Sequence, residues 1–200
     1  MAKRVYRSVA RAESARETRA EILRAAEELF AGQGYTRTTV AQIAECAGVA
    51  VNTVYTSVGG KPALIGALAR ESTDDEAITE SVAAVLAETD PRRILRLTAE
   101  GTGEVTRRRS AFLHVMVDNA ASDPAVAAAA EYAVSRYRQR LATVADRLVA
   151  LGAVRCEART EQILWFYFGT ASWSTARELG WDWDETAAWL ADQAASALLG

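Results

Sequence analysis

Apolar residues recur along this chain at the three- and four-residue spacing of an amphipathic helix, without the alternation typical of β-strands. After Arg16, the first such series consists of Ile22, Ala25, Ala26, Leu29 and Phe30. Gly32 and Gly34 then predict the end of a first helix. Residues 1–14 carry basic side chains with little apolar periodicity, so we expect a mobile arm there.

Two short helices are predicted next. Thr39, followed three residues later by Gln42, has the form of a capping box and predicts the start of a second helix. Gly48 predicts the end of that helix. A third helix is expected over about residues 50–57, and Gly59 interrupts it.

Longer helices are predicted over the rest of the chain. Proline suits the first helical position and aspartate the position before it, as at Asp123 and Pro124. The pattern leaves open whether residues 112–117 continue the helix that begins at Pro91. The helices expected after residue 61 cover 62–72, 75–88, 91 onward, 124–151, 157–179 and 183–199. The predicted fold class is all-α, with about nine helices.

Composition supports a helical protein with a substantial core. Half of the 200 residues are apolar, and only three are proline. No run of 18 apolar residues occurs, so we expect no membrane span, and the basic N-terminal stretch lacks the apolar segment of a signal peptide. Cys46 and Cys156 lie far apart without metal-type spacing, so we expect a cytoplasmic protein without a metal site.

Charge is distributed unevenly along the chain. The net charge of −3 alone argues against nucleic-acid binding. Residues 1–61, however, hold 9 Lys and Arg against 6 Asp and Glu, whereas residues 62–200 hold 14 against 20. A basic N-terminal part on an acidic remainder suggests that only the N-terminal part meets a polyanion, although charge by itself does not decide between this interpretation and chance.

The second and third predicted helices have the residue pattern of a helix-turn-helix. Ala44 supplies a small residue where the two helices would cross, Gly48 tolerates the positive φ of the turn, and Val54 supplies an apolar anchor. The alternative is a generic three-helix bundle with a tight turn. In a helix-turn-helix, the outward residues of the third helix would be Val51, Asn52, Thr53, Tyr55 and Thr56.

The stretch from Arg16 to Leu68 resembles the tetracycline-repressor (TetR) family of transcriptional regulators. The resemblance rests on the segment ILRAAEELFAGQGYTRTTVAQIAECAGVAVNTVYTSVGGKPALI. Two positions depart from the family pattern: Val58 stands where an aromatic residue is usual, and Ala50 stands where serine is frequent. Neither departure removes a group expected to face DNA.

The resemblance implies two domains and a set of DNA contacts. Residues 1–60 would form the helix-turn-helix domain, and residues 61–200 a larger domain for effector binding and dimerisation. Thr38 and Thr39 would contact phosphates, and Tyr55 and Lys61 would do the same. Val51, Asn52 and Thr53 would lie nearest the base edges, with Thr56 on the same outward face.

Aromatic residues of the second predicted domain are candidates for an effector pocket. The candidates are Phe112, His114, Met116, Tyr137, Trp165, Phe168 and Trp173. The alternative assigns these rings to the core or to a dimer interface. His114 is the only histidine, and we interpret it as a core or pocket-wall residue rather than a metal ligand.

The last two predicted helices are candidates for a homodimer interface. A stripe of small and aliphatic residues would allow close helix approach, with tryptophans nearby; it comprises Ala187, Leu190, Ala191, Ala194, Ala195 and Leu198. Packing of the stripe within one chain is the alternative. A two-fold protein matches the two-fold symmetry of a palindromic DNA site.

The sequence therefore predicts a homodimeric repressor that a small apolar or aromatic effector releases from a palindromic operator. One alternative is an activator or ligand-independent regulator with the same DNA-binding domain. Another is a helical small-molecule-binding protein or enzyme whose DNA-binding function has decayed. We expect no enzymatic activity and no cofactor, because no nucleophile–base pair, phosphate-binding loop or paired carboxylates form a recognisable motif.

Overall fold

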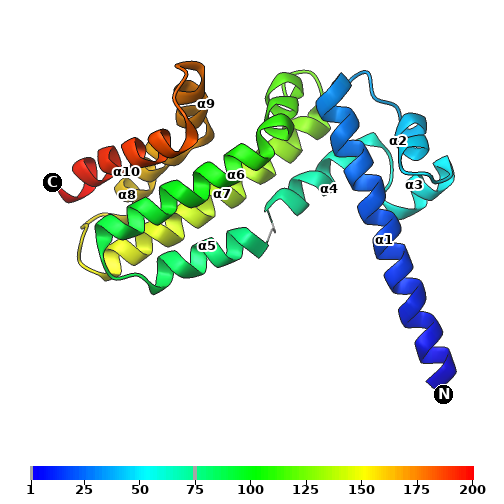
Figure 1. The fold of residues 1–200 in the computed structure, drawn as a ribbon, viewed down its shortest axis with the longest axis horizontal. Helices are drawn as coiled ribbons and strands as arrows, with labels where there is room; N and C mark the ends of the chain where they lie inside the picture. The colour runs from blue at the N-terminus through cyan, green and yellow to red at the C-terminus, as the bar shows by residue number, and fades with distance from the viewer. Residues whose placement is uncertain (1, 74–75) are drawn as a thin grey trace. The chain divides into compact units, whose positions relative to one another are not determined.

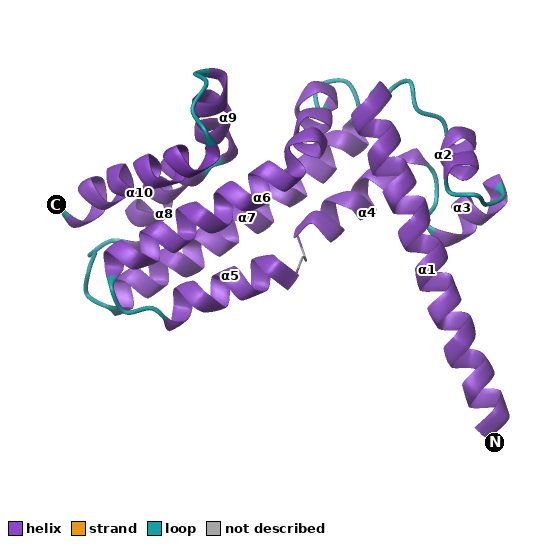
Figure 2. Ribbon diagram, viewed as in Figure 1, coloured by secondary structure: helices purple, strands orange, loops and turns teal. Residues whose placement is uncertain are grey.

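The computed structural model describes the backbone of residues 2–73 and 76–200, which form ten helices and no strand (Figure 2). The helices are α1 (Ala2–Gln33), α2 (Val40–Cys46), α3 (Val51–Ser57), α4 (Lys61–Thr73), α5 (Glu76–Ala87), α6 (Pro91–Asn119), α7 (Pro124–Ala150), α8 (Glu157–Phe168), α9 (Thr170–Glu178) and α10 (Trp183–Leu199). The predicted all-α class is confirmed. No helix in the described ranges is long and apolar enough to cross a membrane.

The first departure from prediction concerns the N-terminus of α1. This helix begins at Ala2, well before the predicted start near Arg16, so residues 2–14 are helical; the mobility of this arm stays a prediction. Residues 2–31 contain neither glycine nor proline and are rich in alanine, arginine and glutamate, which are strong helix formers. High helix propensity thus extends α1 beyond the apolar series on which the prediction rested.

The second departure divides the helix expected over residues 157–179. The backbone at Gly169 is extended, with φ −65° and ψ 157°, and separates α8 from α9. A Cβ atom at this position would lie 2.5 Å from the carbonyl oxygen of Trp165, so only glycine permits this close turn.

The sequence pattern left open whether residues 112–117 continue the helix that begins at Pro91. They do, because α6 runs without a break to Asn119.

The chain divides into two compact units. The first comprises the described residues up to Glu71 together with Ala111–Tyr132, and the second comprises Ser72–Ser110 with Ala133–Gly200. This division describes compactness alone, and the functional boundary near residue 60 stays a prediction. The first unit therefore contains the end of α6 and the start of α7 in addition to the predicted helix-turn-helix.

The core of the first unit joins its N-terminal helices. In Figure 1, α1 to α3 run from blue to cyan, and α1 contacts both α2 and α3, which also contact each other. The buried side chains from α1 to α4 include Ile22, Leu23, Ala26, Phe30, Ile43, Ala44, Val54, Leu64, Ile65 and Leu68. The predicted inward residues Ala44 and Val54 are confirmed as buried.

The core of the second unit is a single cluster drawn from α5 to α10. Its buried members are Val85, Ile94, Leu95, Ala99, Leu141, Val144, Ala145, Leu148, Leu164, Phe168, Trp173, Leu190, Ala191, Ala194 and Ala195. Gly103 of α6 provides the room for its largest ring, because a Cβ atom there would lie 2.5 Å from Cη2 of Trp173. The close approach of α6 to Trp173 thus depends on the absence of a side chain at residue 103.

We expect Gly103→Ala to lower the free energy of unfolding. Forcing a methyl group against the fully buried Trp173 costs about 1–3 kcal/mol, against about 1 kcal/mol gained in helix propensity. Gly66→Ala in α4 is the matched control, because its Cβ atom would make only an ordinary 3.6 Å contact with Arg70. Urea denaturation checks both variants. A Gly103→Ala protein as stable as the Gly66→Ala protein would contradict the close contact.

Candidate nucleic-acid interface

The second helix of the predicted helix-turn-helix begins with the expected capping box. The Thr39 hydroxyl accepts a hydrogen bond from the backbone N–H of Gln42 at 3.2 Å, and the Gln42 side chain accepts one from the Thr39 N–H at 2.8 Å. Both donors would otherwise lack a partner at the start of the helix. The box fixes the direction in which α2 leaves the preceding turn.

The turn between α2 and α3 depends on Gly48. The backbone N–H of Val49 donates to the carbonyl of Ala44 at 2.9 Å, and the N–H of Gly48 donates to that of Glu45 at 3.1 Å. This is the Schellman arrangement, which places Gly48 at φ +65°. The turn needs a residue whose backbone adopts the left-handed conformation with positive φ, so the predicted role of Gly48 is confirmed.

The exposed face of α3 carries four of the predicted residues. Val51 and Tyr55 are 42% and 54% exposed, and Asn52 and Thr56 are exposed beside them. Residues four apart lie on the same side of a helix, so these four form one stripe, which we call the α3 stripe. Thr53 is half-buried and lies at the edge of the α3 stripe.

Local contacts orient two members of the α3 stripe. The Thr56 hydroxyl donates within its own helix, with the carbonyls of Asn52 and Thr53 at 3.0 and 3.2 Å. The Tyr55 ring lies against Gly60, where an added Cβ atom would be 3.6 Å from the ring. The structure therefore leaves Asn52 as the stripe residue with an exposed amide for hydrogen bonding, and directs Tyr55 toward the turn before α4.

Thr38 departs from the phosphate contact that the family resemblance implies. Its side chain is 1% exposed, and its hydroxyl donates to the carbonyl of Gly34 at 2.8 Å and accepts from Gln33 at 3.2 Å. The hydroxyl is thus used to hold the turn before α2. Thr39 is exposed at the start of α2, where its backbone and side chain also form the capping box.

Lys61 makes contacts that the sequence did not predict. Its ammonium group donates to the backbone carbonyls of Tyr35 at 2.8 Å and Thr36 at 3.2 Å, and lies 4.3 Å from the centre of the Tyr35 ring. A lysine ammonium has three donors, so one remains for another acceptor. Its phosphate contact stays a prediction, and its role within the protein is a finding.

Two other residues that support this surface were also missed. The Arg19 guanidinium of α1 donates to the carbonyl of Ser57 at 2.9 Å, where α3 ends. A cation at the end of a helix offsets the partial negative charge of the unpaired carbonyls. Asn119 contacts Thr36 of the turn before α2. Arg19 and Ser57 are 38 residues apart in the sequence, and Thr36 and Asn119 are 83 apart, so no local sequence pattern indicates either contact.

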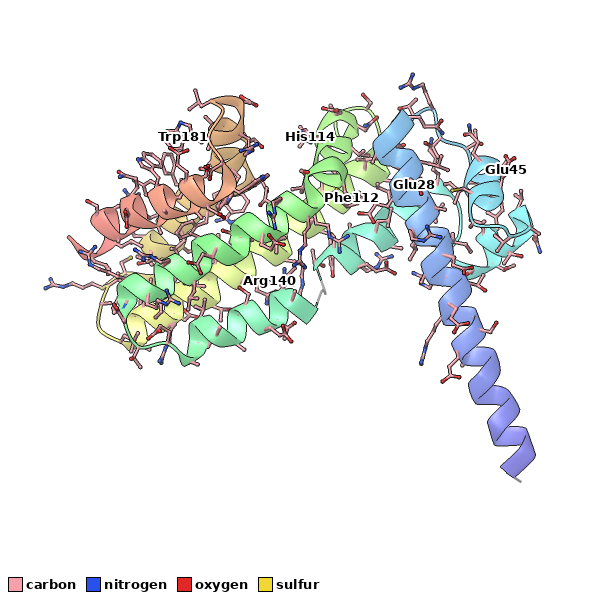
Figure 3. The ribbon with its side chains drawn as sticks, in the orientation of Figure 1. Glu28, Glu45, Phe112, His114, Arg140 and Trp181 are labelled. Carbon is pink, nitrogen blue, oxygen red and sulfur yellow. The ribbon has the colours of Figure 1, made fainter. Side chains whose placement is uncertain are left out.

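The seven predicted pocket residues are divided between the two compact units. Phe112 and His114, which are labelled in Figure 3, belong to the first unit, as does Met116. Phe112 and Met116 are buried. His114 is exposed, contrary to the interpretation as a core or pocket-wall residue. In the part of the chain that the structure describes, no three His, Cys, Asp or Glu side chains gather as a metal site would require.

The other four predicted pocket residues form an aromatic cluster in the second unit. Tyr137 and Trp165 meet edge to face with ring centres 5.7 Å apart. The Tyr137 hydroxyl and, at 3.2 Å, the indole N–H of Trp173 both donate to the carbonyl of Phe168. Burial holds the pKa of Tyr137 well above its usual value, so the hydroxyl stays a donor.

The predicted dimer stripe on the last helix is wrong in detail. Four of its members, Leu190, Ala191, Ala194 and Ala195, are buried within the single chain, so they pack α10 against the core of its own unit. The exposed aromatic surface consists of other residues. Phe166 of α8 is 71% exposed. The half-exposed Trp189 of α10 meets Trp181, which is labelled in Figure 3, with ring centres 5.2 Å apart.

Comparison with known proteins identifies the helix-turn-helix segment. Residues 22–68 match the family of bacterial regulatory proteins described as the tetR family. The HTH-type transcriptional regulator TtgR of Pseudomonas putida is 48% identical over 56 residues. That match covers 28% of this chain and 27% of TtgR, so the sequence similarity to this relative is limited to about a quarter of each protein.

Solved structures resemble the chain over most of its length. The regulator FadR from Bacillus subtilis, in complex with stearoyl-CoA, superimposes with a TM-score of 0.71 at 17% identity, over 90% of this chain and 97% of FadR. The SmeT–triclosan complex gives a TM-score of 0.72 at 19% identity, over 92% of both chains. At these identities, the similarity establishes a shared fold.

Proposed function

Because its N-terminal segment places this chain in the TetR family of bacterial regulatory proteins, we propose that the protein binds DNA and regulates transcription. In this proposal it is a homodimeric repressor of a palindromic operator, released by a small apolar or aromatic effector. The functional division is the expected one, with residues 1–60 binding DNA and residues 61–200 binding effector and partner.

The observation that carries the proposal is the α3 stripe. A short helix that buries only Val54 and exposes Val51, Asn52, Tyr55 and Thr56 contributes little to the core. An α-helix fits the DNA major groove, where an exposed amide can form paired hydrogen bonds with adenine and an aliphatic side chain can contact a thymine methyl group. The net charge of +3 over residues 1–61 favours the same partner.

The proposed effector site involves the aromatic cluster of the second unit. Tyr137, Trp165, Phe168 and Trp173 offer apolar rings with few charges, which favours a flat or apolar ligand over a sugar phosphate. Phe168 and Trp173 are fully buried, so a ligand that contacts them must displace neighbouring side chains. The triclosan complex of SmeT supports this ligand class at the level of a shared fold.

The proposed dimer interface is formed by α8 and α10, which contact each other within the chain. Exposed aromatic side chains are enriched at protein–protein interfaces, and Phe166 and Trp189 are exposed on these helices. Two copies would place two α3 stripes on the two halves of a palindromic site. The four buried residues of the predicted stripe, Leu190, Ala191, Ala194 and Ala195, are covered within the chain and are left out of this interface.

Binding to the DNA upstream of the protein's own gene separates the proposal from its alternatives. A repressor or activator retards that DNA in a gel, and a reporter gene distinguishes the two by the sign of the change in transcription. A small-molecule-binding protein without DNA-binding function retards none of the fragments. An Asn52→Ala variant with unchanged stability serves as the control for sequence-specific binding.

We expect Lys61→Ala to weaken binding to all DNA sequences alike. If the free donor of Lys61 contacts a phosphate, the slope of log K against log salt should shrink by about 0.9 per half-site. Fluorescence anisotropy at several salt concentrations measures the slope. Lys61→Arg keeps the charge and should preserve the slope. A weaker Lys61→Ala protein with an unchanged slope would mean that Lys61 only holds the turn through Tyr35 and Thr36.

We expect Asn52→Ala to reduce affinity by about 1–3 kcal/mol at one base-pair position of each half-site, because the lost amide can pair with adenine. Titrations of operator duplexes substituted at single positions locate the effect. Thr53→Val is the comparison, since Thr53 lies at the edge of the α3 stripe. An equal loss on every operator variant would show that Asn52 only positions the protein.

We expect a ligand that quenches Trp165 to weaken operator binding. The proposed route runs through α4, which begins at Lys61 beside the DNA and whose tilt would change the spacing of the two DNA-binding domains. A coupling of about 1–3 kcal/mol would lower operator affinity by about 5- to 150-fold. Fluorescence titration with small aromatic compounds, triclosan among them, identifies ligands, and Trp165→Phe identifies the responding ring. A ligand that quenches Trp165 and binds tightly, but leaves operator affinity unchanged, would contradict the inducible mechanism.

A further inference from the structure

The turn between α1 and α2, residues 34–39, sets the position of the start of α2. It begins at Gly34, whose φ is +88°, and ends at the capping residue Thr39. Tyr35 is 2% exposed and its ring packs on Phe30 with centres 5.1 Å apart. We call this segment the α1–α2 turn. Any shift of the turn moves the first residues of α2 with it.

The α1–α2 turn is anchored from the chain that follows α3. Lys61, the first residue of α4, donates to the carbonyls of Tyr35 and Thr36. A charged donor makes stronger hydrogen bonds than a neutral one. This anchor fixes the buried side of the turn to α4.

A second anchor comes from the connection between α6 and α7, residues 119–123, which we call the α6–α7 corner. The Thr36 hydroxyl lies 3.2 Å from the side-chain oxygen of Asn119. The Asn119 amide nitrogen donates to the carbonyl of Val115 at 2.8 Å. Because the nitrogen is directed into α6, the oxygen is left facing the turn, where it can accept from Thr36.

The same corner also acts on Tyr35. Burial, followed by the negative charge of Asp123, raises the pKa of Tyr35 to about 12. Asp123 lies near the buried Tyr35 hydroxyl, and both its charge and its acceptor oxygen favour the protonated phenol. Asp123 is itself held in place, since it accepts the N–H of Ala125 at 2.8 Å and caps α7.

We propose that the α6–α7 corner, through Asn119, is a positioning element for DNA binding. Asn119 does not touch DNA; it holds Thr36 and thereby keeps the start of α2 in the geometry that the DNA phosphates require. The inference rests on the proposed DNA-binding function. It agrees with the division by compactness, in which Ala111–Tyr132 belongs to the same unit as the helix-turn-helix. In this proposal, residues beyond the DNA-binding domain of residues 1–60 support its geometry without touching DNA.

The proposal separates two roles that a residue can have in binding DNA. Removing a cationic side chain that contacts phosphate reduces the salt slope, and removing a side chain that reads a base changes the sequence preference. A residue that only preorganises the interface lowers affinity and leaves both properties unchanged, because the set of contacts in the complex is the same. Asn119 should belong to this third class.

The test is a double-mutant cycle on operator affinity with Thr36→Val and Asn119→Ala. Each single variant should weaken binding by about 2- to 10-fold, the effect of one hydrogen bond, with the wild-type salt slope and base preference. The double variant should be no weaker than the weaker single variant, because both changes remove the same interaction. Thr36→Ser keeps the hydroxyl and should bind as the wild type does.

Val117→Ala is the matched control, since it shortens a side chain that is 76% exposed near the same corner without changing the charge, and should not alter affinity. Thermal melting of every variant excludes unfolding as the cause of a loss. Wild-type affinity in folded Asn119→Ala would overturn the positioning role and leave the proposed function standing. Additive losses in the double variant would show that Asn119 acts independently of Thr36, and would also overturn the positioning role. Absence of DNA binding by the wild-type protein would instead contradict the proposed function itself.

Discussion

One ammonium group, that of Lys61, fixes the geometry on which the rest of the first unit depends. It bonds to two consecutive backbone carbonyls, those of Tyr35 and Thr36, and so joins the start of α4 to the turn that precedes α2. These carbonyls lie outside any helix, and a charged donor satisfies both at once. The turn in turn sets where the capping box of Thr39 begins α2.

The third helix illustrates why such anchors are needed. At seven residues, α3 is too short to be stable by itself, and Ala50, the N-cap residue before it, supplies no side-chain cap. Val54 buries one face, Gly48 fixes the approach to the helix, and Arg19 bonds to the carbonyl of Ser57 at its end. These supports act on one side and at both ends of α3. The opposite side therefore carries the α3 stripe, which is left exposed for the proposed contact with DNA.

The features that local sequence determines were predicted, and those that depend on tertiary contacts were not. The capping residues Thr39 and Asp123 mark helix starts through bonds within three residues, and the structure confirms them. The burial of Thr38 and the exposure of His114 depend on what surrounds each side chain. The burial of the α10 stripe also depends on its surroundings, because the same spacing of small and aliphatic residues suits packing within one chain and packing between two chains. The Thr36–Asn119 contact spans 83 residues and has no local signal.

Selection of bound duplexes from a random-sequence DNA library tests the central claim most directly, because it requires sequence reading, two-fold symmetry and a correctly held helix-turn-helix together. We expect the full-length protein to enrich a two-fold symmetric consensus whose half-sites lie about one helical turn, or a multiple of it, apart. Enrichment should weaken as salt is raised. Recovery of no consensus under low-salt conditions, or of one without two-fold symmetry, would contradict a dimeric operator-binding regulator.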